Sequence, residues 1–138
     1  NCTFSENASG FGGAAVENSP AGTLNYTNTI IADSLIGEEG FECNNQGTIV
    51  TNIGNLVEDG SCDSVYSGDP TLGPLADNGG LTQTHALQTE SIAIDNGNLA
   101  ACPDTDQRGV SRPQGEGCDI GAYEWEPFKF SFLPLILR

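Results

Sequence analysis

The chain has 138 residues, which suits one domain, with 18 glycines, 7 prolines, 19 acidic residues and 4 basic residues. The net charge of −15 argues against binding to nucleic acid, which requires clustered Lys and Arg, and against an anionic membrane surface. The same charge favours solubility and the attraction of cations.

The five cysteines indicate an oxidising compartment rather than a metal site, because the chain has no C-x-x-C motif and only one histidine. Cys43 and Cys62 bracket one stretch rich in Gly and Asn, and Cys102 and Cys118 bracket another. We expect these to be two disulfides. Cys2 is left over, and we expect it to be buried or to pair with a residue outside the chain.

The first half of the chain contains short apolar runs rich in β-branched residues, each bounded by Gly, Asn, Asp or Ser. No run has the spacing of an amphipathic helix, so the pattern predicts strands and turns. The predicted strands are Ala14–Val16, Leu24–Tyr26, Ile30–Ala32, Thr48–Val50 and Asn55–Val57.

Similar segments begin at Asn1, Asn28 and Asn52, so both intervals between them lie in the twenties. A period of this length with several short strands per period is typical of a solenoid whose coils stack and bury a common core. Asparagines at matching turn positions are then expected to hydrogen-bond from one coil to the next. A β-sandwich with similarly spaced strands is the alternative.

The composition changes at Gly68, where a turn-dense stretch excludes Pro70 and Pro74 from central strand positions. We expect short strands at 86–88, 91–95 and 119–125, with a long irregular loop over residues 96–114 held by the second disulfide. Residues 1–67 are thus predicted to be the coils, and residues 68–126 the cap that a solenoid needs at its end.

The segment from residue 127 to 138 is apolar and has a high β-propensity. It is too short to span a membrane as a helix, and we expect it to serve in sorting, anchoring or strand donation. The candidate assembly or anchoring residues are Phe128, Phe130, Phe132, Leu133, Leu135, Ile136 and Leu137.

Three segments carry a resemblance to a known family: GDPTLGPLADNGGLTQTHAL, SIAIDNGN and DQRGVSRPQGEGCDIGAYE. Together they resemble the C-terminal part of bacterial surface proteins that have a choice-of-anchor Q domain. The resemblance implies a right-handed parallel β-helix related to that of pectate lyases, and an exported, often surface-attached protein. It implies no catalytic residues. The expected fold is therefore an all-β right-handed parallel β-helix of about three coils, with an irregular disulfide-stapled cap and an apolar C-terminal strand.

A polysaccharide lyase on this fold would need calcium-binding carboxylates and a basic residue to abstract a proton. The candidates are Arg108, Arg112, Lys129 and Arg138, and the first two fall in the irregular loop. Because the net charge would also repel a polyuronate, we expect no enzymatic activity. A carbohydrate-binding module would instead need exposed aromatic residues in a row, for which Tyr26, Tyr66, Tyr123 and Trp125 are available beside the phenylalanines.

Asp104, Asp106 and Asp119 are weak candidates for a calcium site in a turn-rich loop. The favoured interpretation is an ion pair between Asp106 and Arg108 that fixes the loop, so no cofactor is firmly expected. His85, the only histidine, is interpreted as a packed or capping residue. Sequons at Asn1, Asn7 and Asn25 are taken only as indications of surface positions.

The N-terminal residues 1–5 already have the pattern of a strand within a coil. An uncovered coil end exposes unpaired backbone groups, so we expect upstream repeats of a longer chain or another copy of this chain to stack there. The predicted function is a structural module of an extracellular or cell-surface protein that self-assembles head to tail into a filament. A module that binds or adheres to a cell-surface glycan is the alternative.

Overall fold

The structure is a computed structural model that describes residues 1–37 and 40–127. These residues form an all-β fold whose one helical element is a 3-10 turn at Leu99–Ala101. The strands are β1 (Thr3–Ser5), β2 (Ala8–Ser9), β3 (Gly13–Asn18), β4 (Thr23–Thr27), β5 (Ile30–Ala32), β6 (Leu35–Ile36), β7 (Phe41–Asn45), β8 (Thr48–Ile53), β9 (Leu56–Val57), β10 (Leu72–Ala76) and β11 (Thr84–Leu87).

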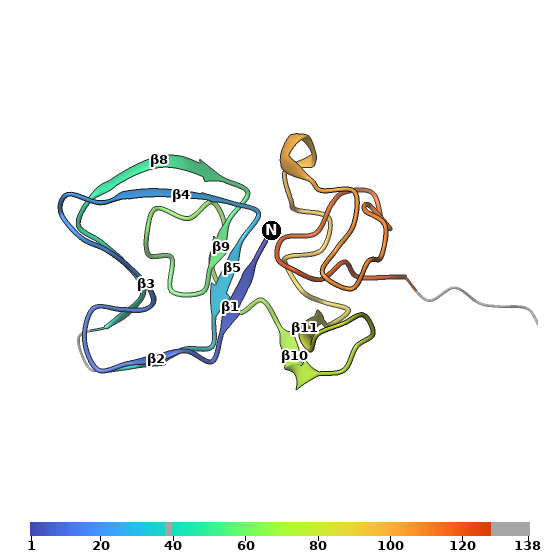
Figure 1. The fold of residues 1–138 in the computed structure, drawn as a ribbon, viewed down its shortest axis with the longest axis horizontal. Helices are drawn as coiled ribbons and strands as arrows, with labels where there is room; N and C mark the ends of the chain where they lie inside the picture. The colour runs from blue at the N-terminus through green and yellow to red at the C-terminus, as the bar shows by residue number, and fades with distance from the viewer. Residues whose placement is uncertain (38–39, 128–138) are drawn as a thin grey trace, which may run out of the picture.

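The first nine strands pair in parallel, and each strand from β1 to β5 pairs with the strand that comes four places later in the chain. The order is β1-β5-β9 in one three-stranded sheet, with β2-β6, β3-β7 and β4-β8 as separate pairs. The chain therefore follows the same closed path twice, and we call each passage a circuit. Figure 1 shows the two circuits lying one over the other. The predicted runs at 14–16, 24–26, 30–32 and 48–50 all lie in these strands, and β9 covers all of the fifth run but Asn55.

The register of β1, β5 and β9 fixes where each circuit begins and ends. Thr3 pairs with Ile30 and Ile30 pairs with Leu56, so the two circuits are nearly equal in length. The prediction that Asn52 begins the third repeat is therefore wrong, because Asn52 lies level with Tyr26 rather than with Asn28. Asn55, rather than Asn52, makes the hydrogen bond between circuits here: its Oδ1 accepts from the Thr29 backbone N–H at 2.9 Å.

Asparagine side chains do hydrogen-bond from one circuit to the next, as predicted. Asn18 Nδ2 donates to Asn45 Oδ1 at 2.6 Å, and Asn28 Nδ2 donates to Asn1 Oδ1 at 3.3 Å. Asn18 and Asn28 are both buried, so these bonds satisfy polar groups that water does not reach.

Strands β5 and β9 of the β1-β5-β9 sheet are buried on both faces. Ile31 and Val57 point into the circuits, where they pack with Tyr26 and Cys43. Ile30 and Leu56 point to the opposite face, as alternation along a strand requires. These two strands therefore have continuous apolar sequences rather than alternating ones.

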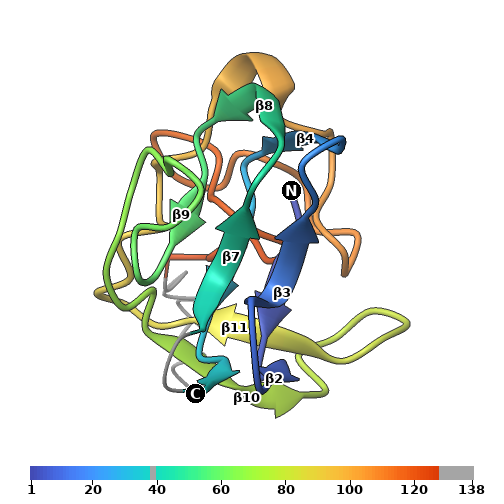
Figure 2. The same cartoon turned by 90° about the vertical axis from the view of Figure 1, so that its left-hand side faces the viewer.

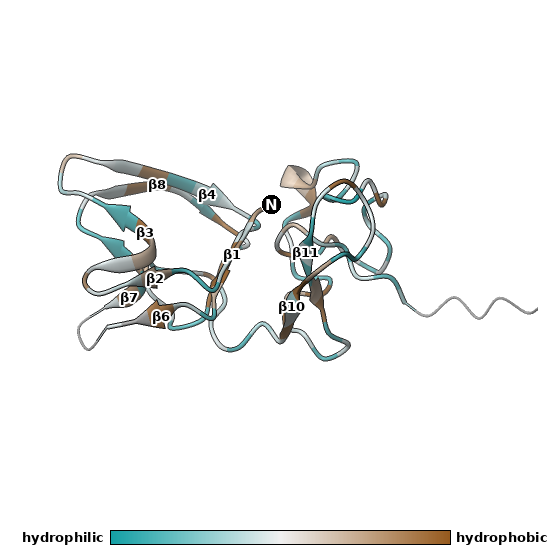
Figure 3. Cartoon of the chain, turned by 60° about the horizontal axis from the view of Figure 1, so that its bottom comes forward, coloured by the Kyte–Doolittle hydropathy of each residue, from teal (hydrophilic) through white to brown (hydrophobic). Residues whose placement is uncertain are grey.

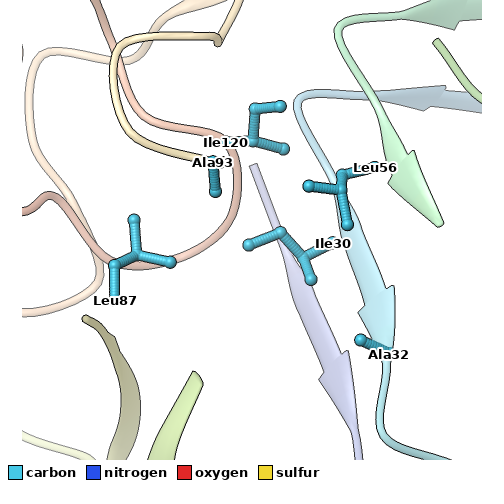
Figure 4. Packing of buried hydrophobic residues seen from close by; sticks show 6 residues of the cluster. All are labelled: Ile30, Ala32, Leu56, Leu87, Ala93 and Ile120. Carbon is cyan, nitrogen blue, oxygen red and sulfur yellow. The ribbon is translucent and has the colours of Figure 1, made fainter. Parts of the chain in front are cut away.

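Residues 68–125 pack on the outer face of that sheet. Leu87, Ala93 and Ile120 form one cluster with Ile30, Ala32 and Leu56 (Figure 4). Figures 1 and 3 show this C-terminal part beside the two circuits rather than across their end. The segment predicted as an end cap is thus a lateral cover, because outward-facing Ile30 and Leu56 leave an apolar surface that must be buried.

The segment from 59 to 67 covers one end of the circuits. Tyr66 N–H donates to the Asn55 carbonyl and Val57 N–H donates to the Tyr66 carbonyl, which adds one more rung beside β9. The Tyr26 hydroxyl donates a hydrogen bond to the Cys62 carbonyl, and Cys62 is joined to Cys43 by a disulfide. This short segment, rather than residues 68–126, closes the end of the stack.

Two predicted strands are absent. Residues 91–95 form turns instead, because Ile94 N–H donates to the Ser91 carbonyl and Ala93 N–H donates to Ser91 Oγ. The segment 119–125 bends at residues 120–122 and pairs with no strand, and side-chain carboxylates accept several of its N–H groups. Glu124 Oε2 accepts from Asp119 N–H and Asp106 Oδ2 accepts from Glu124 N–H.

One strand occurs where turns alone were expected. β10 contains Pro74 and pairs antiparallel with β11 in a two-stranded hairpin, which Figure 2 shows below β7 and β3. The register shifts between Leu72 and Leu75, so the ladder is interrupted at the proline, which has no N–H to donate. The predicted strand at 86–88 begins earlier, at Thr84.

Candidate functional site

The end of the circuits opposite residues 59–67 is hollow. A cavity of about 320 Å³ opens among side chains of the first circuit and the beginning of the second. Its lining residues are Asn1, Cys2, Phe4, Val16, Leu24, Asn25, Tyr26, Thr27, Thr29 and Ile31. We call this cavity the end hollow.

The end hollow contains no charged side chain, although the chain has a net charge of −15. Phe4 is level with Ile31 in the sheet register and is 40% exposed. Among the described residues, strands β1 to β4 each pair along one edge only, so their other edges lie at this end. The combination of an apolar hollow and free strand edges is what a further strand or coil requires of a docking surface.

Cys2 lies at the end hollow with an exposed, free thiol. The other four cysteines form Cys43–Cys62 and Cys102–Cys118, the two pairs expected from the sequence. Within the described residues Cys2 therefore has no disulfide partner.

A second hollow, of about 620 Å³, lies between the circuits and the β10-β11 hairpin. Glu6 and Asp33 reach it from equivalent positions just after β1 and β5, and His85 reaches it from β11. His85 Nδ1 lies 2.9 Å from the Gly73 carbonyl, which agrees with its interpretation as a packed residue. The sequence pattern did not single out Glu6 and Asp33, although they stand at the same place after the repeat asparagines Asn1 and Asn28.

The predicted ion pair between Asp106 and Arg108 is present, with Arg108 Nη2 2.8 Å from Asp106 Oδ2. Burial acts to raise the pKa of Asp106, but backbone N–H groups of Glu124 and Val110 and the Arg108 side chain hold it below its usual value. Arg108 also lies over the ring of Tyr123, 3.6 Å from its centre. Asp106 also accepts a hydrogen bond from Glu124 N–H and Arg108 donates one to the Glu124 carbonyl, so the pair connects the loop to the segment 119–125.

The second arginine of the loop is also held inside the C-terminal part. Arg112 Nη1 lies 3.2 Å from Glu124 Oε2, and both side chains are essentially inaccessible. Burial lowers the pKa of Arg112, while the charges of Glu124, Asp106 and Asp119 oppose that effect. Both arginines are therefore buried in ion pairs of the C-terminal part.

The three calcium candidates of the C-terminal loop are not brought together. Asp106 is occupied by Arg108 and backbone N–H groups, and Asp119 accepts hydrogen bonds from the backbone of Asp95 and Trp125. Asp104 is exposed. Across the part of the chain that the structure describes, no group of three His, Cys, Asp or Glu residues is arranged to hold a metal ion.

The aromatic candidates for sugar binding are not aligned on the surface. Tyr26 is 8% exposed inside the circuits, whereas Tyr66, Tyr123 and Trp125 pack against the cluster between the sheet and the C-terminal part. The exposed aromatic side chains are instead those of Phe4, Phe11 and Phe41.

Of the three sequon asparagines, Asn25 is exposed. Asn1 and Asn7 are half-buried and use their side-chain amides in hydrogen bonds to the Ala101 and Ser5 carbonyls. The proposed assembly residues Phe128, Phe130, Phe132, Leu133, Leu135, Ile136 and Leu137 lie outside the described residues.

None of the helices in the described residues has the length and apolar character to cross a membrane. Comparison with known proteins found no matching family model, no matching curated protein and no matching solved structure.

Proposed function

We propose that the protein is a non-catalytic structural module of a secreted or cell-surface bacterial protein, built as a right-handed parallel β-helix. The support for this fold is the parallel pairing of strands four places apart, with circuits that bring Thr3, Ile30 and Leu56 into one register. The segment 59–67 supplies a shorter third coil. Two disulfides are consistent with an oxidising, extracellular location.

The single observation that carries the structural role is the uncharged end hollow in a strongly acidic protein. Interface cores are depleted of charged residues, so such a patch is suited to contact with another chain. The opposite end is closed by residues 59–67 and is therefore not suited to receive it.

The occupant that we propose for the end hollow is the apolar C-terminal segment of a second copy. Its sequence FKFSF alternates, so an extended chain presents Phe128, Phe130 and Phe132 on one face. That face would enter the hollow while the backbone pairs with a free strand edge. Because the donor and acceptor surfaces differ, this contact does not close on itself and leads to a filament.

Size-exclusion chromatography with light scattering, followed by electron microscopy, tests this function on the full chain. We expect concentration-dependent assemblies that are lost in Phe4→Asp, because a carboxylate would be buried in the end hollow. Phe11→Asp is the matched control, since Phe11 is 85% exposed and does not line the hollow.

Deletion of residues 128–138 gives an independent test that leaves the hollow intact, and we expect it also to abolish assembly. Circular dichroism of each variant establishes that it is folded. A wild-type chain that remains a monomer at all concentrations, or a Phe4→Asp variant that assembles normally, would show that the proposal is wrong.

A further inference from the structure

Strand β4 contributes more residues to the lining of the end hollow than any other strand. Leu24 and Tyr26 point into the circuits, where they belong to one hydrophobic cluster, whereas Thr23 and Asn25 are exposed on the outer side. β4 therefore has an apolar inner face and a polar outer face, as a strand covered on one side does. Among the described residues it pairs only with β8, so its opposite edge is available to another strand.

The other strand edges at this end are less suited to receive a strand. β2 has two residues, and β3 begins with Gly-Ala-Ala at 13–15, has a register shift there and sends only Val16 to the hollow. The outer side of β1 meets the C-terminal part, where the Ala122 N–H donates to Thr3 Oγ1 at 3.1 Å. A strand added beside β1 would adjoin this covered face, where a charged side chain is disfavoured.

The segment FKFSF at residues 128–132 has both the length and the alternation of β4. It has five residues, as β4 does. Pro127 and Pro134 lie on either side of it, and because proline has no N–H, a paired strand cannot extend far past either end. An extended chain with its phenylalanines on one face presents Lys129 and Ser131 on the other. This is the pattern of a strand that is covered on one face and in contact with water on the other.

We propose that the C-terminal segment of a second copy pairs with β4 and thereby extends the β4-β8 sheet. This pairing presupposes the self-assembly proposed above and identifies its acceptor strand. The phenylalanines then enter the hollow against Leu24 and Tyr26, and Lys129 lies in solvent on the outer face, beside Asn25. The edge of β4 supplies main-chain hydrogen bonds and the hollow receives alternate side chains, which is the geometry of strand addition.

A charge swap between Asn25 and Lys129 tests this arrangement by light scattering of the full chain at low ionic strength. Like charges directly opposite each other on paired strands are unfavourable, so Asn25→Lys should raise the concentration at which half of the protein is assembled by about two- to fivefold. Combining Asn25→Lys with Lys129→Glu should restore assembly, because the two charges then attract each other.

The net charge makes this effect specific to the site. The protein carries −15, so an added positive charge elsewhere on its surface reduces self-repulsion and favours association. Val50→Lys is the matched control, since Val50 is 66% exposed in β8, the next strand of the same sheet. We expect Val50→Lys to assemble at least as well as the wild type. Equal weakening by Val50→Lys and Asn25→Lys would overturn the proposal.

Cysteine cross-linking identifies the acceptor strand directly. In a Cys2→Ser background whose assembly has been verified by light scattering, Lys129→Cys is combined with Asn25→Cys. Neighbouring side chains on paired strands come within the reach of a disulfide, so mild oxidation should give disulfide-linked multimers on a gel without reductant. Val50→Cys in place of Asn25→Cys should give none, because β8 would lie two strand spacings, about 10 Å, from the added strand.

The same experiment with Thr3→Cys or Glu17→Cys reports pairing at β1 or β3. Multimers linked through either of these positions, and not through Asn25, would overturn the choice of β4 while self-assembly itself stands. A link between residues 25 and 129 that forms only within monomers would show that the chain's own segment covers β4, and would overturn the contact between copies. If the wild type does not assemble at all, the proposed function fails and this pairing fails with it.

Discussion

At the scale of single residues, buried carboxylates organise the C-terminal part. Glu124 is 0% exposed and accepts hydrogen bonds from the backbone N–H groups of Gln114 and Asp119. Asp119 is 1% exposed and accepts from Asp95 and Trp125. These carboxylates satisfy the backbone where no strand ladder exists, which is why an irregular segment can be buried.

Asp119 leads to a prediction about pH. Burial raises the pKa of Asp119 from 3.8 to about 6, against the opposing effect of the N–H groups of Asp95 and Trp125. Between these values the folded protein binds more protons than the unfolded chain, so the contribution of Asp119 to stability falls as the pH rises. Urea unfolding from about pH 4 to pH 7 should show a decline through pH 6 that Asp119→Asn lacks. Equal slopes in the two proteins would contradict this assignment.

The sequence allowed some of these residue roles to be predicted. The Asp106–Arg108 ion pair follows from opposite charges two residues apart in a loop, and the structure has it. The burial of Glu42 and Glu124 could not be predicted, because their neighbours in sequence resemble those of exposed glutamates such as Glu17. Their burial depends on which distant backbone N–H groups lack a partner, and the fold alone determines that.

At the scale of elements, the segment 59–67 depends on its disulfide. Cys43 and Cys62 are 19 residues apart, and both are buried. Their replacement by alanine in one variant should lower the free energy of unfolding by about 3 kcal/mol, which urea titration measures. The Glu42 and Cys43 N–H groups donate to Asp59 and Ser61 in this segment, so hydrogen exchange should accelerate there.

The other disulfide supplies a control for this prediction. Cys102 and Cys118 are 16 residues apart, so their replacement by alanine should cost a similar free energy. In this second variant, the amide hydrogens of Glu42 and Cys43 should exchange at the rate expected from global unfolding alone. If exchange of these two amides accelerated equally in both variants, the Cys43–Cys62 disulfide would have no local effect on the segment 59–67.

Strands were predicted where β-branched residues form runs, as at Ile30–Ala32. β2 and β6 have two residues each and leave no pattern to detect. The run at residues 91–95 alternates as a strand would, but the Ser91 hydroxyl accepts a local hydrogen bond that favours turns. Local side-chain bonds of this kind compete with strand pairing and cannot be weighed from composition.

At the scale of the whole molecule, the circuits and the C-terminal part share one hydrophobic cluster. Ile120 is 0% exposed between Ile30 and Leu56 of the sheet and Ala93 of the C-terminal part (Figure 4). Gly121 follows it and donates its N–H to the Asn28 carbonyl at 2.8 Å. A Cβ on Gly121 would lie 2.7 Å from Ile30 Cδ1, so a glycine permits this close approach. The lateral arrangement was not predictable, since the sequence does not tell which face of a strand remains to be covered.

This shared cluster predicts that the two parts unfold together. Ile120→Ala should reduce the free energy of unfolding by about 2–5 kcal/mol, because it opens a cavity between them. Trp125, the only tryptophan, reports on the C-terminal part by fluorescence, while far-ultraviolet circular dichroism reports mainly on the strands of the circuits. Both signals should give the same midpoint in urea, in the wild type and in the variant. If fluorescence changed at a lower urea concentration than circular dichroism, the C-terminal part would be a separate unit that the sheet supports only weakly. Coincident midpoints that shift together would mean that burial of Ile30 and Leu56 by this cover is part of what keeps the circuits folded.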